Sequence, residues 1–207
     1  YRTTWKFRAA VLLAIVMAVV VPRRFWVQSI TDGLTCAEDV RPADALLVEN
    51  FDPEYLVFLK AARLFHLGLA PRVFVPVPLA GEGAHSQIDI VAEREAHMMA
   101  ELSYLSPMEI VPFEIVEPIS LNAAKQIRDV LLREKIHSVL VVTPGMRSRR
   151  STLVYGTVFN ASGIELRCAP VFDEDQSRVR WATTLHGMQE TLLQALKLLY
   201  YKFWVLL

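Results

Sequence analysis

Residues 138–142 read SVLVV, a short run that is apolar at every position after the first. The side chains of a strand alternate between the two faces of its sheet, so this run would be apolar on both faces. That property is typical of a central strand in a parallel sheet that helices cover on both sides. The stretch therefore predicts a buried parallel strand at the centre of the fold.

Strand-like runs alternate with helical periods along the rest of the sequence. The predicted strands are residues 43–48, 72–77, 110–116, 138–142 and 164–171, and the predicted helices are residues 53–69, 88–105, 120–136, 147–160 and 181–207. Pro112 lies inside the third strand and cannot donate a ladder hydrogen bond, which favours an edge or bulged strand. This order predicts an α/β fold: a three-layer α/β/α sandwich around an open, mostly parallel, Rossmann-like sheet of about five strands.

Two of the predicted helices carry apolar residues at helical spacing, and we expect these stripes to face the sheet. The stripes are Ile88, Val91, Met98, Leu102 and Leu105 in one helix, and Ala124, Ile127, Val130 and Leu131 in the other. In open sheets of this kind, ligands bind at the carboxyl ends of the strands. The loops that follow residues 48, 77, 116 and 142 are therefore the places where a site is expected.

An apolar run of 13 residues lies near the start of the sequence, at 9–21 (AAVLLAIVMAVVV). Aromatic and basic residues flank it, and a helix from Trp5 to Trp26 would cover roughly 30 Å, the thickness of a bilayer core. The run predicts one transmembrane helix. The predicted organisation is an anchor in residues 1–27, a linker in residues 28–42 and an α/β domain in residues 43–207.

Two other interpretations of the apolar run are a cleaved signal peptide and a buried core helix. A cleaved signal peptide would need a small-x-small cleavage site, which the sequence after the run does not supply. A buried core helix fits the paired arginines and tryptophans at the ends less well. Three basic residues precede the run and two follow it, namely Arg2, Lys6, Arg8, Arg23 and Arg24. This one-charge excess favours an inner-membrane protein with its domain on the periplasmic, extracytoplasmic side.

The composition argues against nucleic acid and zinc as binding partners. The 207 residues carry 22 basic and 22 acidic side chains, so the formal net charge is zero and no nucleic-acid partner is expected. Cys36 and Cys168 are the only cysteines, too few for a tetrahedral zinc site, and we leave open whether they form a disulfide or two separate thiols. No cofactor and no metal are predicted.

A set of short segments resembles a known family. The segments are ADALLV at 43–48, AARL at 61–64 with Gly68 and Ala70-Pro71, Glu95-Ala96 with Met98, Ser120 with Asn122, VVT at 141–143 and SRRS at 148–151. In this order they resemble the SanA/YdcF/ElyC family of envelope proteins, whose domain of uncharacterised function is often preceded by one membrane helix. The resemblance covers about residues 41–171, and the fold it implies agrees with the predicted order of strands and helices.

The sequence departs from the pattern of that family at its presumed active site. Glu49-Asn50 stands where the family has two glycines, and Pro76-Val77-Pro78 replaces a second glycine pair. The family motif Ser-x-Asn-Thr-x-Glu-Asn keeps Ser120 and Asn122 but has Ala123, Lys125 and Gln126 at its other positions. Arg147 replaces an expected histidine. Because Lys125 and Arg147 stay protonated near pH 7 where an acid-base pair would stand, we expect no catalytic residues and favour a protein without enzymatic activity.

One loop is a candidate anion site. Three arginines lie at a predicted helix start, where backbone N–H groups and the helix dipole favour an anion, and three polar residues could contribute to the same site. The candidates are Arg147, Arg149, Arg150, Thr143, Ser120 and Asn122. The alternative is that the arginines are solvated or pair with Glu49, Asp52 or Glu117, and that the polar residues are caps.

A second row of polar residues recurs every four positions: His85, Asp89, Glu93 and His97. We interpret it as a solvated helix face rather than a metal site, because the row faces away from the apolar stripe and lacks a metalloenzyme spacing. Ser151 has no histidine near it in the sequence, so no Ser-His-Asp arrangement is predicted.

The last predicted helix has an unusually apolar sequence that includes Leu192, Leu193, Leu196, Leu199, Tyr200, Phe203, Trp204, Leu206 and Leu207. We expect it either to pack on the sheet with its tip at the membrane interface or to offer an apolar stripe to a partner. Ordinary core packing is the alternative.

These observations favour a non-catalytic, single-pass membrane protein that acts as an accessory or structural subunit of a membrane or envelope complex. Its expected partners are membrane lipid and other integral membrane subunits. The alternative is an envelope enzyme or binding protein that uses the Arg147 loop, with carboxylates such as Glu49, on anionic, phosphate-bearing lipid-linked or glycan precursors.

Overall fold

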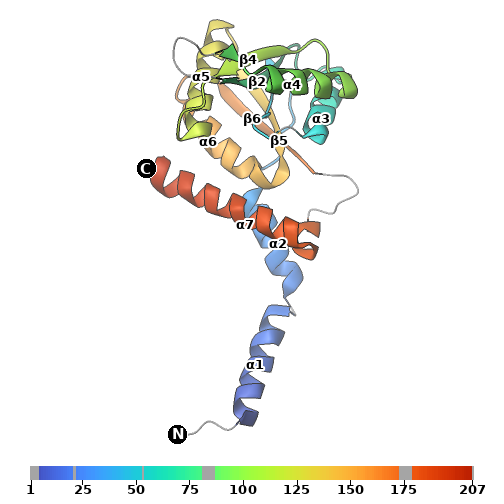
Figure 1. Cartoon of the computed structure of the whole chain (residues 1–207), viewed down its shortest axis with the longest axis vertical. Helices are drawn as coiled ribbons and strands as arrows, with labels where there is room; N and C mark the ends of the chain where they lie inside the picture. The colour runs from blue at the N-terminus through green and yellow to red at the C-terminus, as the bar shows by residue number, and fades with distance from the viewer. Residues whose placement is uncertain (1–4, 21, 53, 81–86, 173–178, 207) are drawn as a thin grey trace.

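A computed structural model describes residues 5–20, 22–52, 54–80, 87–172 and 179–206 (Figure 1). The main elements in chain order are α1 (Trp5–Val20), α2 (Arg23–Leu34), β1 (Ala45–Val48), α3 (Tyr55–His66), β2 (Val73–Ala80), β3 (Gln87–Ile88), α4 (Ile90–Ser103), β4 (Glu109–Phe113), α5 (Ile119–Arg133), β5 (Ser138–Pro144), α6 (Ser148–Asn160), β6 (Glu165–Val171) and α7 (Leu185–Tyr200). The turns η2 (Gly145–Arg147) and η3 (Arg180–Thr183) precede α6 and α7, and the π-helical turn η4 (Tyr201–Val205) follows α7. Residues 81–85, for which the sequence predicts a loop, lie outside the described residues.

Six strands form one sheet in the order β3-β2-β1-β5-β6, with β4 also paired to β2. All pairs are parallel except the short pairing of β3 with the end of β2. The predicted central strand lies in β5, between β1 and β6, and the prediction of a mostly parallel sheet is confirmed. The short β3 adds one strand to the predicted five. Among the described residues β4 pairs with β2 alone, which gives Pro112 the edge position expected for it.

Helices cover both faces of the sheet. Alternate residues of β1 enter two separate cores: Leu46 and Val48 pack with residues of α3 and α4, whereas Ala45 and Leu47 pack with residues of α5 and α6. This alternation is the direct result of the period of two in a strand. It produces the three predicted layers (Figure 1).

The structure contradicts the stripe predicted for α4. Ile88 and Leu105, at the two ends of the predicted helix, do pack in the core. The large apolar residues between them are exposed: Val91, Met98 and Leu102. The helix instead turns Ala96 and Ala100 toward the core. Small side chains allow a helix to approach its neighbours closely, and Ala92 and Met99 also pack against this core. In α5, by contrast, Ala124, Ile127 and Leu131 are buried as predicted, and Val130 is partly buried against the same core.

The N-terminal segment forms two helices rather than one. α1 ends at Val20 and α2 begins at Arg23, with Pro22 at its N-cap position. Proline lacks a backbone N–H and disfavours a continuous helix through its position. No helix in the described ranges is both long enough and apolar enough to cross a membrane. Residues 28–34, expected to be linker, belong to α2, and α1 extends away from the body of the molecule (Figure 1).

A disulfide joins Cys36 to Cys168. It links the chain just after α2 to the middle of β6, and the backbone N–H of Cys36 also donates to Ser148 Oγ at the start of α6. Of the two states left open for these cysteines, the structure contains the bonded one. The bond fixes the end of α2 to the α/β body.

Candidate functional site

The order of the sheet defines where a ligand would bind. The chain runs outward from β1 to β2 and β4, then returns to β5 on the opposite side of β1. The carboxyl ends of β1 and β5 therefore flank the topological switch point, the usual ligand position in such sheets. Glu49 directly follows β1, and Thr143 lies near the end of β5. These two residues form the centre of the candidate site.

Glu49 is a buried carboxylate with its hydrogen bonds satisfied inside the protein. It is 2% exposed. Thr143 Oγ1 donates to Glu49 Oε2, and Ser151 Oγ, from α6, lies 2.7 Å from Oε2 and 2.9 Å from Oε1. A buried charge is costly unless it is hydrogen-bonded, and the two hydroxyls supply this stabilisation. The cluster joins β1, β5 and α6 at the switch point.

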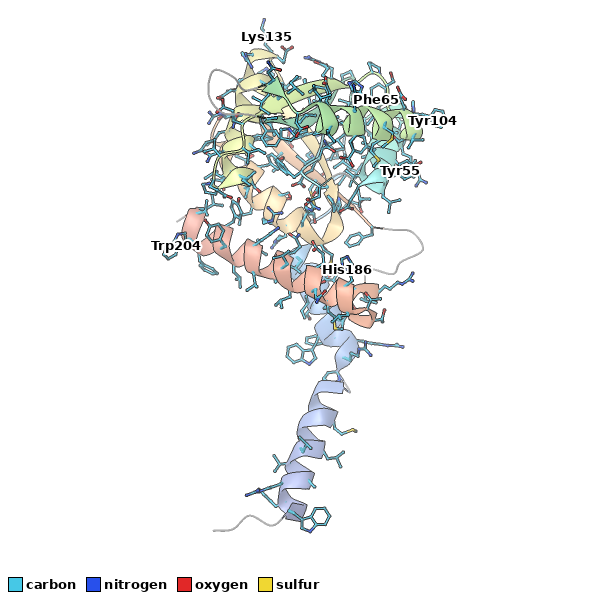
Figure 2. All side chains as sticks on the ribbon, viewed as in Figure 1. Tyr55, Phe65, Tyr104, Lys135, His186 and Trp204 are labelled. Carbon is cyan, nitrogen blue, oxygen red and sulfur yellow. A yellow bond between two sulfur atoms is a disulfide. The ribbon has the colours of Figure 1, made fainter. Side chains whose placement is uncertain are left out.

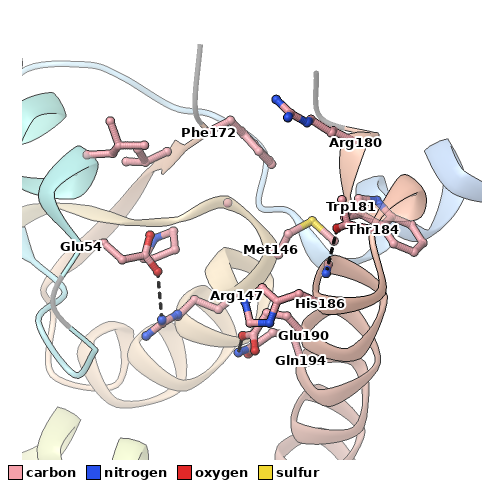
Figure 3. Close-up of a pocket in the computed structure, with 15 residues that line it drawn as sticks. Glu54, Met146, Arg147, Phe172, Arg180, Trp181, Thr184, His186, Glu190 and Gln194 are labelled. Atoms are coloured by element: carbon pink, nitrogen blue, oxygen red, sulfur yellow. Dashed lines mark hydrogen bonds and ion pairs between the residues drawn. The ribbon is translucent and has the colours of Figure 1, made fainter. Parts of the chain in front are cut away.

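Arg147, the candidate from the η2 turn, is also buried and is paired with two carboxylates. Its Nη1 lies 3.0 Å from Asp52 Oδ2. Its Nη2 lies 3.3 Å from Glu54 Oε1, the contact drawn in Figure 3. Burial raises the pKa of Glu54; the charge of Arg147 opposes this rise, and nearby carboxylates, Glu190 among them, add to it. The expectation that this arginine could pair with local acids is confirmed for Asp52.

Arg150, in the first turn of α6, has neutral hydrogen-bond partners. Its Nη1 donates to Ser120 Oγ at 2.9 Å, its Nη2 lies 3.5 Å from Gln194 Oε1 on α7, and its guanidinium lies 5.7 Å from the centre of the Tyr201 ring. The side chain is 7% exposed, yet its Nε has no hydrogen-bond partner in the described part of the chain. Unlike Arg147, it forms no ion pair with a described carboxylate.

Two of the six anion-site candidates lie elsewhere. Arg149 is exposed, because adjacent residues of a helix point about 100° apart and its neighbour Arg150 takes the inward direction. The Asn122 amide donates to the carbonyl oxygens of Val116 and Glu117 at 3.2 and 3.0 Å and thus fixes the loop before α5. Thr143, Arg147, Arg150 and Ser120 are the candidates that the fold brings together.

Ser120 also differs from its expected role as a helix cap. Pro118 occupies the N-cap position of α5, and Ser120 is the second residue of the helix, where its hydroxyl accepts from Arg150. Its backbone N–H donates to the hydroxyl oxygen of Tyr201 at 3.1 Å. Ser120 therefore connects α5 to α6 and to the end of the C-terminal helix.

Sequence reasoning missed two residues of this region. Tyr155 on α6 is buried, and its hydroxyl has no partner among the described residues; burial raises its pKa well above the ordinary value, the charge of Glu49 adds to the rise, and the charges of Arg150 and Arg147 oppose it. Asn50 donates to the carbonyl oxygen of Pro76 at 3.3 Å, whereas its Oδ1 has no described partner. Tyr155 carried no sequence signal, because it occupies an ordinary core position of an amphipathic helix. The position of Asn50, directly after a strand, was the available signal for that residue.

Two cavities open at this edge of the sheet, and Arg147 contributes to both. The first, of about 550 Å³, lies between the ends of β5 and β6 and the beginning of α7 (Figure 3). Its charged lining is balanced, because Glu54 and Glu190 face Arg147 and Arg180. His186 is the remaining titratable side chain of this lining.

The second cavity, of about 490 Å³, lies between the ends of β2 and β4 and the far end of α7. Its cations are Arg147, Arg150 and Lys197, and its anions are Asp52 and Glu117. The remaining lining is largely aromatic or aliphatic: Phe51, Pro78, Phe113, Ile115, Ile119, Tyr200 and Tyr201, with Ser120 as a neutral polar residue. An excess of positive charge beside apolar walls suits an anion that carries a hydrocarbon part.

The row predicted to be solvated does not assemble a metal centre in the described residues. Asp89 is the N-cap of α4, and its side chain accepts from the backbone N–H groups of Val91 and Ala92. His97 is exposed, and His85 lies outside the described residues. No group of three or more metal-binding side chains is found within the described ranges.

Comparison with known proteins adds no relative: no model of a protein family, no curated protein and no solved structure matches this chain.

Proposed function

We propose that this chain is a membrane-anchored, non-catalytic α/β domain, similar to the SanA/YdcF/ElyC family, that serves as an accessory or structural subunit of a membrane or envelope complex. The observation that carries the proposal is that the carboxylate at the switch point is buried and already hydrogen-bonded within the protein. Glu49, the carboxylate placed where chemistry would occur, is buried and bonded to Thr143 and Ser151. A general base must reach a proton on a substrate, and this geometry leaves Glu49 none to reach.

Lys125 and Arg147, which replace the acid-base residues expected from the family, also support a non-catalytic domain. Arg147 is held by Asp52 and Glu54, so its charge is balanced inside the protein. Lys125 lies on the exposed side of α5. The residues at the edge of the sheet therefore stabilise the fold. We assign the function to the exposed apolar surfaces of the molecule instead.

The exposed apolar side chains of α1 support the anchor. Trp5, Phe7, Leu12 and Leu13 are all more than half exposed, and the helix projects from the body of the molecule (Figure 1). Large apolar surface of this kind is unfavourable in water and favourable in lipid. Phe25 and Trp26, exposed at the start of α2, would lie at the membrane interface, where aromatic residues are enriched.

The disulfide supports a location on the periplasmic side of the inner membrane. Disulfides persist in oxidising compartments and are rare in the reducing cytosol. The Cys36–Cys168 bond lies in the α/β body, so the body belongs in the oxidising compartment. This agrees with the small charge asymmetry around the apolar run.

The exposed apolar residues of α4 support the part of the proposal that concerns a contact with another protein subunit. Val91 is 75% exposed, and Met98 and Leu102 lie on the same helix with at least half of their surfaces exposed. An apolar patch on a surface distant from α1 suits a contact with another subunit. Figure 1 shows α4 on the opposite side of the body from α1.

The experiment is extraction of the full chain from its native membranes in a mild detergent, followed by native gel electrophoresis and mass spectrometry of the band. We expect a stoichiometric assembly that contains other membrane proteins. Met98→Lys should dissociate it without unfolding the domain, whereas His97→Lys, which places the same charge at an exposed neighbouring position, should leave it intact. A lone monomer in a detergent micelle would contradict the proposal.

A second candidate function is favoured by one specific observation, the unpaired Nε of the buried Arg150 beside the positively charged cavity. In this role the domain binds a phosphate-bearing amphiphile, with the phosphate near Arg150 and Lys197 and the hydrocarbon part along the aromatic wall. Charge-assisted hydrogen bonds to a guanidinium are well suited to phosphate.

Native mass spectrometry with added phosphatidic acid tests this candidate. Lys197→Met should reduce the bound fraction several-fold, because Lys197 is exposed and its replacement leaves the core unchanged. Lys135→Met is the matched control on the distant side of the body and should have no effect (Figure 2). Equal retention of phosphatidic acid and phosphatidylcholine by the native chain would exclude the candidate.

A further inference from the structure

α7 has its polar and apolar faces reversed relative to a helix packed on a soluble domain. Its residues buried against the body are Thr191 and Gln194. Beside the exposed polar residues His186, Gln189, Lys197 and Lys202, its exposed surface includes an apolar series at helical spacing that continues into η4: Leu185, Met188, Leu192, Leu196, Leu199 and Phe203, with Leu193 and Trp204 next to them. We call these eight apolar residues the α7 stripe.

The buried polar side of α7 is specifically bonded, so the orientation of the helix is fixed. Gln194 Oε1 accepts from Arg150 at 3.5 Å, and Gln194 Nε2 donates to Glu190 Oε1 at 2.7 Å. At the far end Tyr201 is buried and bonded to Ser120. The Gln194–Glu190 bond lies within α7, but rotating the helix to hide its leucines would break the bonds to Arg150 and Ser120 and expose a buried arginine. The α7 stripe therefore needs an apolar medium outside the body.

The α7 stripe is continuous with the membrane-facing part of the chain. The Arg23 guanidinium at the start of α2 donates to the carbonyl oxygen of Ala182 at 2.8 Å, and Trp181 Nε1 donates to Thr31 Oγ1 at 2.9 Å. These two bonds hold the beginning of α7 against α2, which follows α1 almost directly. In Figure 1, α7 lies between the α/β body and α1 and runs across the direction of α1.

We propose that α7 lies flat in the lipid–water interface, with the α7 stripe in the outer acyl region of the bilayer and the α/β body above it. The proposal rests on the membrane anchor of the proposed function. A helix with one apolar and one polar face is the usual element for this position. Trp204 at one end of the stripe is a typical interfacial residue, and the exposed Arg24 and Lys202 suit anionic headgroups.

The test uses the full chain in nanodiscs of phosphatidylcholine and phosphatidylglycerol in equal parts. Single cysteines carry a nitroxide label under non-reducing conditions that preserve the native disulfide. The labelled variants are Leu196→Cys and Phe203→Cys in the stripe, Leu13→Cys in α1 and Lys135→Cys on the distant side of the body. Collision rates with oxygen, which partitions into lipid, and with a nickel chelate, which stays in water, are measured by electron paramagnetic resonance.

We expect the oxygen-to-nickel collision ratio at both stripe positions to exceed the ratio at Lys135 several-fold. A water-like ratio in the stripe would overturn the inference, as would low collision rates with both reagents, which indicate a protein partner or a second copy on the stripe. The Leu13 label separates this failure from failure of the anchor: a lipid-like ratio at Leu13 with a water-like ratio at Leu196 refutes the interfacial helix alone. A water-like ratio at Leu13 refutes the anchor itself.

Discussion

Ser151 Oγ lies 2.7 and 2.9 Å from the two carboxylate oxygens of Glu49, although 102 residues separate them in the chain. The contact joins the end of the first turn of α6 to the residue that follows β1. Because Glu49 is buried, the serine hydroxyl takes the place of water in stabilising its charge. The pair is therefore a structural bond across the switch point.

Ser151→Ala should reduce the free energy of unfolding by about 1–3 kcal/mol, the usual cost of leaving a buried polar group without a partner. Chemical denaturation followed by circular dichroism measures the change. Thr157→Ala on the same helix is the control, because its exposed hydroxyl bonds only the carbonyl oxygen of Leu153. Equal stability of Ser151→Ala and the native chain would show that the contact contributes nothing.

Glu54 should make the stability of the domain depend on pH. Burial raises its pKa above the ordinary value of 4.5. The stabilisation of the folded state that this raised pKa provides is therefore fully present below pH 4.5, and it is lost as the pH rises through the raised pKa. The stability of the native chain relative to Glu54→Gln should therefore decline as the pH increases across this window. Denaturation of both proteins at a series of pH values measures the difference, and a constant difference would refute the expectation.

The succession of strands and helices along the chain could be predicted because the strands are short, apolar and separated by amphipathic helices. The sequence SVLVV at 138–142 lies in β5 at the centre of the sheet, and Pro112 lies in an edge strand. β3 could not be predicted, because two residues carry too little pattern to distinguish a strand from a loop.

The helix faces were harder to predict, because periodicity shows that a helix is amphipathic but not which medium lies outside it. In α4 the buried residues are the small Ala96 and Ala100, and Met98 is exposed. In α7 the buried face is polar, and the leucines are outside. Only α7 reverses the rule that the more apolar face is covered by the same chain; the covered side of α4, which includes Met99, is apolar, but large apolar residues lie on its exposed side as well.

The site could be predicted in part. Glu49 follows β1 and Thr143 lies near the end of the parallel strand β5, so the topology alone brings them to one edge of the sheet. The partners of Arg147 depend on the path of the loop after β1, which no pattern determines. Ser151 and Tyr155 come from the inner side of α6, and their approach to Glu49 is visible only once α6 is packed.

Asp44 should also make the stability of the domain depend on pH, but in the direction opposite to that predicted for Glu54. Its Oδ2 accepts from the backbone N–H groups of His137 and Ser138 at 2.9 and 2.8 Å, which fixes the start of β5 beside the start of β1. These bonds, led by the one from His137, lower the pKa of Asp44 below 3.8. Its stabilisation is therefore present above that value and is lost as the pH falls through the lowered pKa.

Asp44→Ala should thus lower the free energy of unfolding by about 1–3 kcal/mol at neutral pH, since hydrogen bonds to a charged group are lost. The difference from the native chain should shrink in acid. Asp129→Ala is the control, because its exposed carboxylate bonds only its neighbour Arg128. A loss of stability that persists unchanged at low pH would show that the charge of Asp44 is not responsible.

The disulfide offers the largest single effect on stability. Cys36 and Cys168 are 132 positions apart, so their bond restricts a long segment of the unfolded chain. Replacing both with serine should reduce the free energy of unfolding by about 2–5 kcal/mol. The same loss should appear when the native chain is unfolded with a reductant present, and the double variant should not respond to the reductant. If the native chain titrated two free thiols under non-reducing, denaturing conditions, the bond would be absent, and the support it gives to an oxidising, extracytoplasmic location would be lost with it.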